Sequence, residues 1–117
     1  MYGLPQDIDL TFFVGQMLSQ VCFSRHILIL NFDDNVSISI ESSIGFSSPN
    51  SDIQKNEDFC LMADTLLSLL EQKIISVHTD PNGTLTLCFA NIALIIYDDS
   101  SCYESYVIQN GMTVIVV

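Results

Sequence analysis

Residues 26–41 read HILILNFDDNVSISIE and carry the clearest structural pattern in the chain. Val36, Ile38 and Ile40 alternate with serines, and a period of two in β-branched residues predicts a half-buried strand. The Asp33-Asp34-Asn35 segment before them tolerates the positive backbone angles of a tight turn. The stretch therefore predicts a β-hairpin with one strand on each side of an acidic turn.

The same pattern recurs in the second half of the chain. Residues 85–89 (LTLCF) match residues 28–32 (LILNF) at a shift of 57, and residues 72–77 parallel residues 16–21 at a shift of 56. The one-residue difference falls at a turn signal, Asp80-Pro81-Asn82-Gly83. The chain is therefore interpreted as two related three-stranded halves. An internal duplication and the generic alternation of β strands are both sufficient explanations.

The remaining segments predict a loop, a helix and a last hairpin. Residues 47–52 (SSPNSD) are typical of a loop. Apolar residues at helical spacing then predict one amphipathic helix over roughly residues 57–71. Residues 103–109 and 112–117 are strand-like, and Asn110-Gly111 between them is a two-residue turn signal. The apolar stripe of the helix consists of Phe59, Met62, Ala63, Leu66 and Leu70.

Together these elements predict a mainly β (α+β) fold. We expect an antiparallel sheet or a two-sheet sandwich of about eight short strands, covered on one side by the amphipathic helix. The chain has 117 residues, which fits a single domain over residues 1–117. Within this domain we expect a first β-meander over about residues 16–47, a loop and helix over about 48–71, and a second β-meander with the C-terminal hairpin over about 73–117.

The charge of the chain is strongly one-sided. There are 14 acidic side chains against three basic ones, Arg25, Lys55 and Lys73, which gives a formal net charge of -11. Such a field steers a molecule toward cationic surfaces. It opposes binding to nucleic acid, whose phosphates require cationic side chains. The competing explanation is that the carboxylates only keep a hydrophobic domain soluble.

Location and redox state follow from the apolar runs and the cysteines. The longest apolar runs, such as residues 92–97, are far shorter than the roughly 20 residues that span a bilayer. The first residues lack the cationic start of a secretory signal, so we expect a cytoplasmic protein. Four cysteines, Cys22, Cys60, Cys88 and Cys102, form no Cys-x-x-Cys pair. They predict buried, reduced thiols and no zinc site.

The sequence offers little to an enzyme. Neither His26 nor His78 belongs to a nucleophile or metal motif, and no glycine-rich phosphate loop is present. The two histidines occupy corresponding regions of the two halves, which suggests that they lie near each other. Residues 98–104 contain several oxygen ligands but lack the spacing of a calcium loop. We therefore expect no catalysis, no metal and no cofactor.

Residues 97–106 (YDDSSCYESY) are the best candidate for a binding surface. They hold three tyrosines and three carboxylates, in a chain without tryptophan. Tyrosine is favoured as an interface anchor, and carboxylates pair with lysine or arginine on a partner. The alternative is an ordinary corner between strands, with inward tyrosines and solvated acids. Together with the acidic hairpin turn, the predicted partner-binding residues are Asp33, Asp34, Tyr97, Asp98, Asp99, Tyr103, Glu104 and Tyr106.

Four groups of residues also carry a resemblance to known proteins. They are Gly15-Gln16-x-Leu18-x-x-Val21, Phe32-Asp33-Asp34 with Ile40-Glu41, Gly83-Thr84-Leu85-x-Leu87-x-Phe89, and Tyr103-Glu104-Ser105-Tyr106. This pattern, over about residues 15–111, resembles a group of small uncharacterised bacterial β-rich proteins. In size and acidity the chain is similar to the immunity proteins of bacterial contact-dependent growth inhibition systems. The resemblance implies a cytosolic inhibitor of a toxin domain delivered by a neighbouring cell, and it transfers no contact residue by position.

The leading hypothesis from the sequence is therefore an immunity protein. It would bind and neutralise a basic nuclease toxin domain, an RNase in particular, as a monomer in a 1:1 complex without nucleic acid or membrane. The alternative is a small acidic secretion chaperone or another acidic interaction module. A chaperone would expose an apolar groove and dimerise.

Overall fold

The computed structural model describes residues 3–5, 7–100 and 104–117, and describes residues 51–53 by their backbone alone. These residues form a mainly β fold, as the alternation predicts. The helical elements are the 3-10 turns η1 (Thr11–Phe13) and η2 (Phe59–Met62) and the helix α1 (Ala63–Ser68). The ten strands over the described residues are β1 (Leu18–Phe23), β2 (Leu28–Phe32), β3 (Val36–Ile40), β4 (Ile44–Ser48), β5 (Ser51–Asn56), β6 (Ser76–Thr79), β7 (Leu85–Cys88), β8 (Ala93–Ile96), β9 (Tyr106–Asn110) and β10 (Thr113–Val116).

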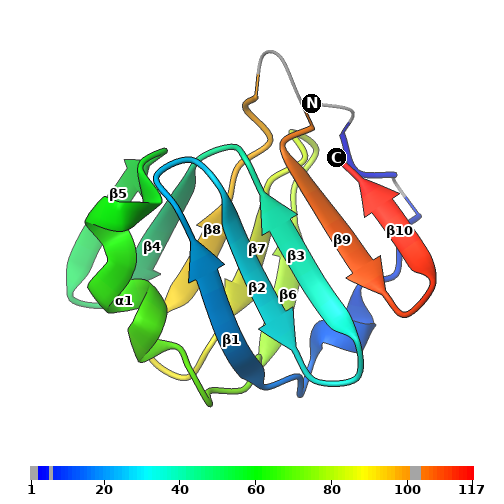
Figure 1. Ribbon diagram of the computed structural model, residues 1–117, viewed down its shortest axis with the longest axis horizontal. Coiled ribbons are helices and arrows are strands. Elements are labelled where there is room, and N and C mark those ends of the chain that lie inside the picture. The colour runs from blue at the N-terminus through cyan, green and yellow to red at the C-terminus, as the bar shows by residue number, and fades with distance from the viewer. Residues whose placement is uncertain (1–2, 6, 101–103) are drawn as a thin grey trace.

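The strands make two antiparallel sheets that face each other. The first sheet has the strand order β1-β2-β3-β9-β10 and lies at the front of Figure 1. The second has the order β5-β4-β8-β7-β6 and lies behind it. Of the two architectures that the sequence allowed, the two-sheet sandwich is the one formed.

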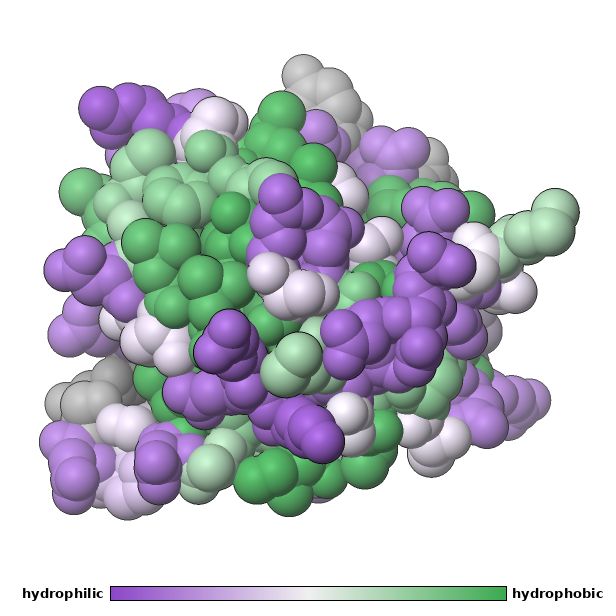
Figure 2. Space-filling view, turned by 60° about the horizontal axis from the view of Figure 1, so that its bottom comes forward, coloured by the Kyte–Doolittle hydropathy of each residue, from purple (hydrophilic) through white to green (hydrophobic). Residues whose placement is uncertain are grey.

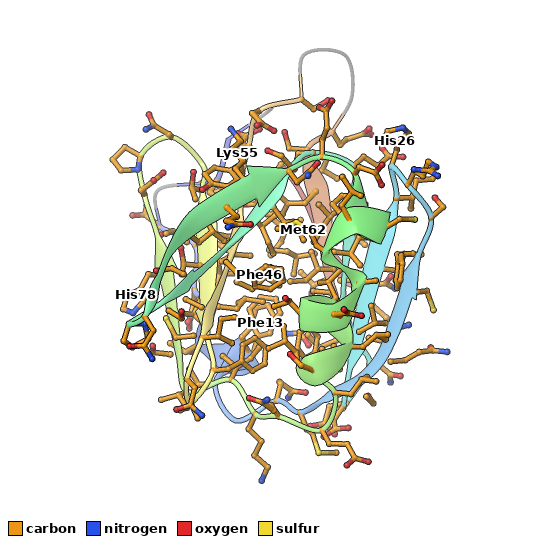
Figure 3. The ribbon with its side chains drawn as sticks, turned by 90° about the vertical axis from the view of Figure 1, so that its left-hand side faces the viewer. Phe13, His26, Phe46, Lys55, Met62 and His78 are labelled. Carbon is orange, nitrogen blue, oxygen red and sulfur yellow. The ribbon has the colours of Figure 1, made fainter. Side chains whose placement is uncertain are left out.

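The core lies between the sheets and is built from the inward-facing positions of the strands. Val36, Ile38 and Ile40 are at most 2% exposed, so the predicted alternation is confirmed. Phe13 and Phe46 point into the space between the sheets (Figure 3). Burial of one such side chain contributes roughly 1.5–3 kcal/mol relative to exposure. The alternation therefore decides which face of each sheet turns inward.

The acidic turn between β2 and β3 has the predicted backbone. Asp34 and Asn35 have φ angles of 57° and 62°. The N–H of Val36 donates to the carbonyl oxygen of Asp33 at 3.2 Å. Two consecutive positive φ angles are those of a type I′ turn, whose twist matches that of the flanking strands. The Asp-Asn pair is suited to these angles because short polar side chains tolerate the left-handed region.

The two halves of the chain are arranged with approximate two-fold symmetry. Each half begins with a three-stranded meander, β1-β2-β3 or β6-β7-β8, and its next two strands cross to the opposite sheet. There β9 pairs with β3, and β4 pairs with β8. Each half therefore supplies the outer hairpin of the sheet that the other half begins.

The junction between the halves repeats this symmetry in its hydrogen bonds. Met17 and Lys73 form an isolated antiparallel bridge, and they are related by the shift of 56 found in the sequence. The N–H of Leu18 donates to the carbonyl oxygen of Gln72, and the N–H of Ile74 donates to the carbonyl oxygen of Gln16, each at 3.0 Å. These two bonds are also related by the shift of 56, so the local two-fold axis passes through the bridge.

Gly15 and Glu71 occupy equivalent positions beside this junction. Their φ angles are 87° and 67°. Each N–H donates across the junction at 2.8 Å, Gly15 to Ile74 and Glu71 to Leu18. Glycine adopts a positive φ at little cost, whereas a residue with a Cβ loses about 1–2 kcal/mol there. The second half therefore carries backbone strain at the position where the first half has glycine.

Equivalent segments also cover the two open sides of the sandwich. The segment of η2 and α1 lies over the side between β1 and β5 (Figure 1). The N-terminal segment with η1 contacts β6 on the opposite side. Leu10 and Phe13 of this segment are buried, and so are Leu66 and Leu69, which follow them by 56 residues.

Three parts of the sequence-based prediction are wrong in detail. Residues 47–52 are not a loop, because they end β4 and begin β5. For this reason ten strands form where about eight were expected. The helical segment is shorter than predicted, since α1 ends at Ser68. The last hairpin turns at Gly111 and Met112, one residue later than Asn110-Gly111, and Gly111 has a φ of 59°.

The strain at Glu71 predicts that Glu71→Gly stabilises the protein. Relief of the positive φ outweighs the extra backbone entropy of glycine in the unfolded chain, so we expect the free energy of unfolding to rise by roughly 0.5–1 kcal/mol in urea titrations. Glu71→Gln removes the same charge and keeps the strain, and it serves as the control. Equal stability of the two variants would contradict the prediction.

Candidate partner-binding surface

The predicted binding segment is one of two chain crossings at the upper end of the sandwich in Figure 1. Residues 41–43 carry the chain from β3 to β4, and residues 97–100, 104 and 105 are the described part of the connection from β8 to β9. The two crossings are bonded to each other, because the N–H groups of Glu41 and Ser42 both donate to the carbonyl oxygen of Ser105, at 3.0 and 3.1 Å. We call these two segments the crossover end.

Asp99 is held by donors from two other segments. Its carboxylate accepts from the N–H and Oγ of Ser43, at 3.3 and 2.6 Å, and lies 2.8 Å from Nζ of Lys55. The same ammonium lies 4.3 Å from the centroid of the Tyr97 ring, within cation–π distance. Burial raises the pKa of Asp99, but hydrogen bonds from Lys55 and Ser43 outweigh it, so this pKa lies below its ordinary value of 3.8. Asp99 is therefore a structural carboxylate as well as a surface one.

Asp98 belongs to a network around a buried serine. Ser105 is 0% exposed, and its Oγ donates to Oδ1 of Asp98 at 2.5 Å. The N–H of Ser100 donates to the same Oγ at 3.2 Å. A buried hydroxyl that both donates and accepts fixes the path of the crossing. The predicted acidic segment is thus built into the fold.

Tyr106 lies in the core and anchors the turn between β6 and β7. It is 1% exposed, and its hydroxyl donates to the carbonyl oxygen of Gly83 at 2.7 Å. Burial, together with the charge of Asp98, raises the pKa of this hydroxyl well above its ordinary value of 10.0. Gly83 has a φ of 83°, and a Cβ built there would meet Oδ2 of Asp98 at 2.5 Å. Only glycine fits this position without a shift of the carboxylate.

The predicted contact residues do not form one surface. Asp33 and Asp34 are exposed in the β2–β3 turn, at the end of the sandwich opposite the crossover end (Figure 1). Figure 2 brings that opposite end forward and shows hydrophilic patches among hydrophobic ones. Glu104 is exposed at the crossover end, and Tyr97 is half-buried there. Tyr103 lies outside the described residues.

Tyr106 is the predicted contact residue that the structure removes from the surface. Its ring occupies an inward position of β9, where Tyr106 is opposite Ile40 of β3. A side chain with 1% exposure has no area to offer a partner. The sequence interpretation of Tyr106 as an anchor is therefore corrected to that of a core residue.

Glu41 is an exposed carboxylate of the crossover end that the sequence analysis did not select. It follows β3 directly, and the pairing of β3 with β9 brings it beside Ser105 and Glu104. The alternation of 36–40 marked Glu41 as solvent-facing. Its neighbours could be found only from the pairing of strands that are distant in sequence.

The acidic side chains lie almost wholly outside the strands. Of the 14 carboxylates only that of Asp52 belongs to a strand. Two of the three basic side chains are in ion pairs, Arg25 with Asp58 at 3.0 Å and Lys55 with Asp99 at 2.8 Å. The negative charge is therefore carried by turns, crossings and the helical segment, and the faces of the sheets are left nearly free of it.

The two histidines are far apart. His26 lies in the turn between β1 and β2, and His78 lies in β6 of the other sheet (Figure 3). The proximity that their sequence positions suggested is therefore wrong. Oγ of Ser76 is 3.3 Å from Nε2 of His78, an exposed contact within one strand. Within residues 3–5, 7–100 and 104–117, no three histidine, cysteine or acidic side chains are grouped to hold a metal ion.

The cysteines and the main groove add no reactive cluster. Cys22 and Cys60 are exposed free thiols and Cys88 is half-buried, so the expected burial is wrong for the first two. Cys102 lies outside the described residues. An open groove of about 680 Å³ runs between residues 47–50 and 88–93, and its lining has no charged side chain and no histidine.

The fold and the surface together define a class: a small β-sandwich with exchanged hairpins and acidic ends. The chain belongs to DUF6188, a family of unknown function, whose model matches residues 10–117. No curated protein and no solved structure matches it. In the part of the chain that the structure describes, no helix is long and apolar enough to cross a membrane.

The bond between Tyr106 and Gly83 gives a stability prediction. Tyr106→Phe leaves the carbonyl oxygen of Gly83 without its buried donor, so the free energy of unfolding should fall by roughly 1–2 kcal/mol in urea titrations. Tyr97→Phe is the matched control, because the Tyr97 hydroxyl bonds to no described residue. An equal fall in the free energy of unfolding of the two variants would show that the hydrogen bond to Gly83 does not contribute to stability.

The lowered pKa of Asp99 gives a pH prediction. A carboxylate with a depressed folded-state pKa contributes stability above its unfolded pKa and loses this contribution as pH falls through the folded value. The stability difference between wild type and Asp99→Asn should therefore shrink as pH is lowered from about 6 to about 2. Ser43→Ala removes one donor and should show a smaller change over the same range. A difference that is constant with pH would rule out this role for Asp99.

Proposed function

We propose that this protein binds a cationic protein partner through the crossover end and that this partner is a basic nuclease toxin domain. Binding would neutralise the toxin and make the chain an immunity protein that acts in the cytoplasm. The proposal agrees with the resemblance in size and acidity to immunity proteins of contact-dependent growth inhibition systems. An RNase is the toxin class that we favour.

The exposed carboxylates of Glu41 and Glu104 are the observation that carries this proposal. Glu41 follows β3 and Glu104 precedes β9, and these strands are paired with Ile40 opposite Tyr106. The N–H of Glu41 is bonded to the carbonyl oxygen of Ser105, and Glu104 directly precedes this serine, so both carboxylates lie next to one backbone contact between the crossings. The nearby ammonium of Lys55 is already paired with Asp99. Negative charge at this end is thus available to a cationic surface.

A nuclease presents the complementary chemistry. Its substrate site holds phosphates with lysine and arginine side chains, which supply much of its affinity for nucleic acid. Carboxylates on a preordered backbone can pair with the same side chains and exclude the phosphates. The net charge of -11 adds long-range attraction, which accelerates encounter with a basic protein.

The direct test uses the product of the gene immediately upstream, which the proposal predicts to end in a basic nuclease domain. We expect the two proteins to co-purify at 1:1 and the chain to block cleavage of RNA by that domain. A domain that cleaves RNA equally well with a molar excess of the chain would rule out the immunity function. An acidic secretion chaperone would instead bind an extended segment and leave a folded nuclease active.

Charge-matched variants test the surface itself. Glu41→Gln/Glu104→Gln should lower the association rate constant with the basic domain by roughly 3- to 10-fold at low salt, because close charges dominate steering. Asp33→Asn/Asp34→Asn removes the same total charge from the opposite end and should have a much smaller effect. Stopped-flow mixing at several salt concentrations gives both rates. Equal slowing by the two pairs would show that net charge acts without a specific surface.

A further inference from the structure

The outer edge of β10 has unpaired backbone groups. β10 is the last strand of the first sheet, and Figure 1 shows it at the margin of that sheet. Tyr106 and Val117 exchange backbone hydrogen bonds, so the hydrogen-bonded pairs with β9 continue at every second residue of β10. The N–H and carbonyl groups of Val114 and Val116 therefore point away from β9. They form no hydrogen bond with a described residue outside the hairpin. Unpaired groups in this geometry are complementary to another β-strand.

The outer face of the first sheet beside this edge is uncharged. Val114 is 56% exposed and Val116 is 39% exposed. Both side chains lie on the outer face of the first sheet, as the register with β9, β3, β2 and β1 shows. None of the residues on this face carries a charge, in a chain with 14 acids. They are Gln20, Cys22, Ile29, Asn31, Ser37, Ser39, Val107, Gln109, Val114 and Val116.

The other edges of the sandwich are protected. The symmetry equivalent of β10 is β5, which contains Lys55, and a charged residue at an edge discourages pairing. The edge of β1 is flanked by the helical segment, which is bonded to its neighbourhood through the N–H of Phe59 and the carbonyl oxygen of Arg25 at 2.8 Å. The edge of β6 is in contact with η1. The N-terminal segment passes β10 on this side (Figure 1), but no backbone hydrogen bond joins its described residues to β10, and β10 itself carries no charge.

We propose that the occupant of this edge is β10 of a second copy of this chain, paired antiparallel. The backbone N–H and carbonyl groups of Val114 and Val116 are the donors and acceptors of this pairing. They are all used when Val114 of one copy lies opposite Val116 of the other. The two-fold axis then passes beside Ile115, and the pairing closes at two copies. The two first sheets would join into one continuous sheet.

The lack of charge along β10 disfavours a cationic partner, whereas antiparallel pairing of β10 with a second β10 is self-complementary. Two molecules of net charge -11 repel each other, and an uncharged surface is where they meet with the least opposition. A basic partner has no carboxylate to pair with at this edge and is drawn to the acidic ends. Salt therefore acts in opposite directions: screening strengthens the dimer and weakens binding of a basic domain.

Sedimentation velocity between about 10 µM and about 1 mM tests this proposal, because a strand-edge contact is a small interface that needs high concentration. We expect the mass to rise from 13.0 kDa toward twice that value, and to rise further when NaCl is added. Val114→Lys/Val116→Lys should remain monomeric throughout, although it lowers the negative charge. Ile75→Lys, at an apolar side chain that is 59% exposed elsewhere, should still dimerise.

Amide hydrogen exchange of the unmodified chain gives a second readout that does not depend on a variant. Exchange at the N–H groups of Val114 and Val116 should slow as concentration rises. A monomer at every concentration and salt, or a dimer that survives Val114→Lys/Val116→Lys, would overturn the proposal. So would protection at another strand edge. None of these results depends on the basic domain, and failure here leaves the immunity function standing. Success would replace the monomer expected from the sequence with a dimer, and inhibition of the nuclease would still separate an immunity protein from a chaperone.

Discussion

The pairing of β9 with β3, and of β4 with β8, is the interaction on which the rest of the structure depends. Each half of the chain completes the sheet that the other half begins, so the chain must cross twice between the sheets. Both crossings fall at the same end. There the carbonyl oxygen of Ser105 accepts hydrogen bonds from residues 41 and 42 of the first crossing, and its hydroxyl donates to Asp98 of the second. A crossing removes backbone groups from the strand ladders, and these groups need partners. The serines and carboxylates of the crossover end supply them.

The sequence predicted those parts of the fold that depend on local pattern. Alternation gave the inward faces of β2 and β3, and the repeated motif gave the equivalence of the halves. The β4–β5 hairpin escaped prediction because Ser47 and Ser48 interrupt the apolar pattern and resemble a loop. β4 forms because β8, which is distant in sequence, offers it a partner, and β5 then pairs with β4. Exchange of hairpins between sheets leaves no local signal.

The candidate site was predicted in part for the same reason. Glu104 and the acidic pair Asp98-Asp99 were found from composition, but no composition separates an inward tyrosine from an outward one, and Tyr106 is inward. Glu41 joins the site through strand pairing alone. Asp33 and Asp34 share its charge and lie at the other end. The sequence thus pointed to exposed carboxylates, and the topology decides which of them lie at the same end of the sandwich.

The negative charge lies in turns, crossings and covering segments because the strands of both sheets are almost all apolar or neutral. The acidic crossover end is therefore distinct from the uncharged β10 edge. The central claim is that the crossover end meets a basic protein. Amide hydrogen exchange of this chain, with and without the basic domain encoded upstream, tests it most directly. We predict that the domain slows exchange at residues 41–43 and 97–105 and leaves residues 33–35 unchanged. Protection confined to the β2–β3 turn, or to the β10 edge, would contradict the account.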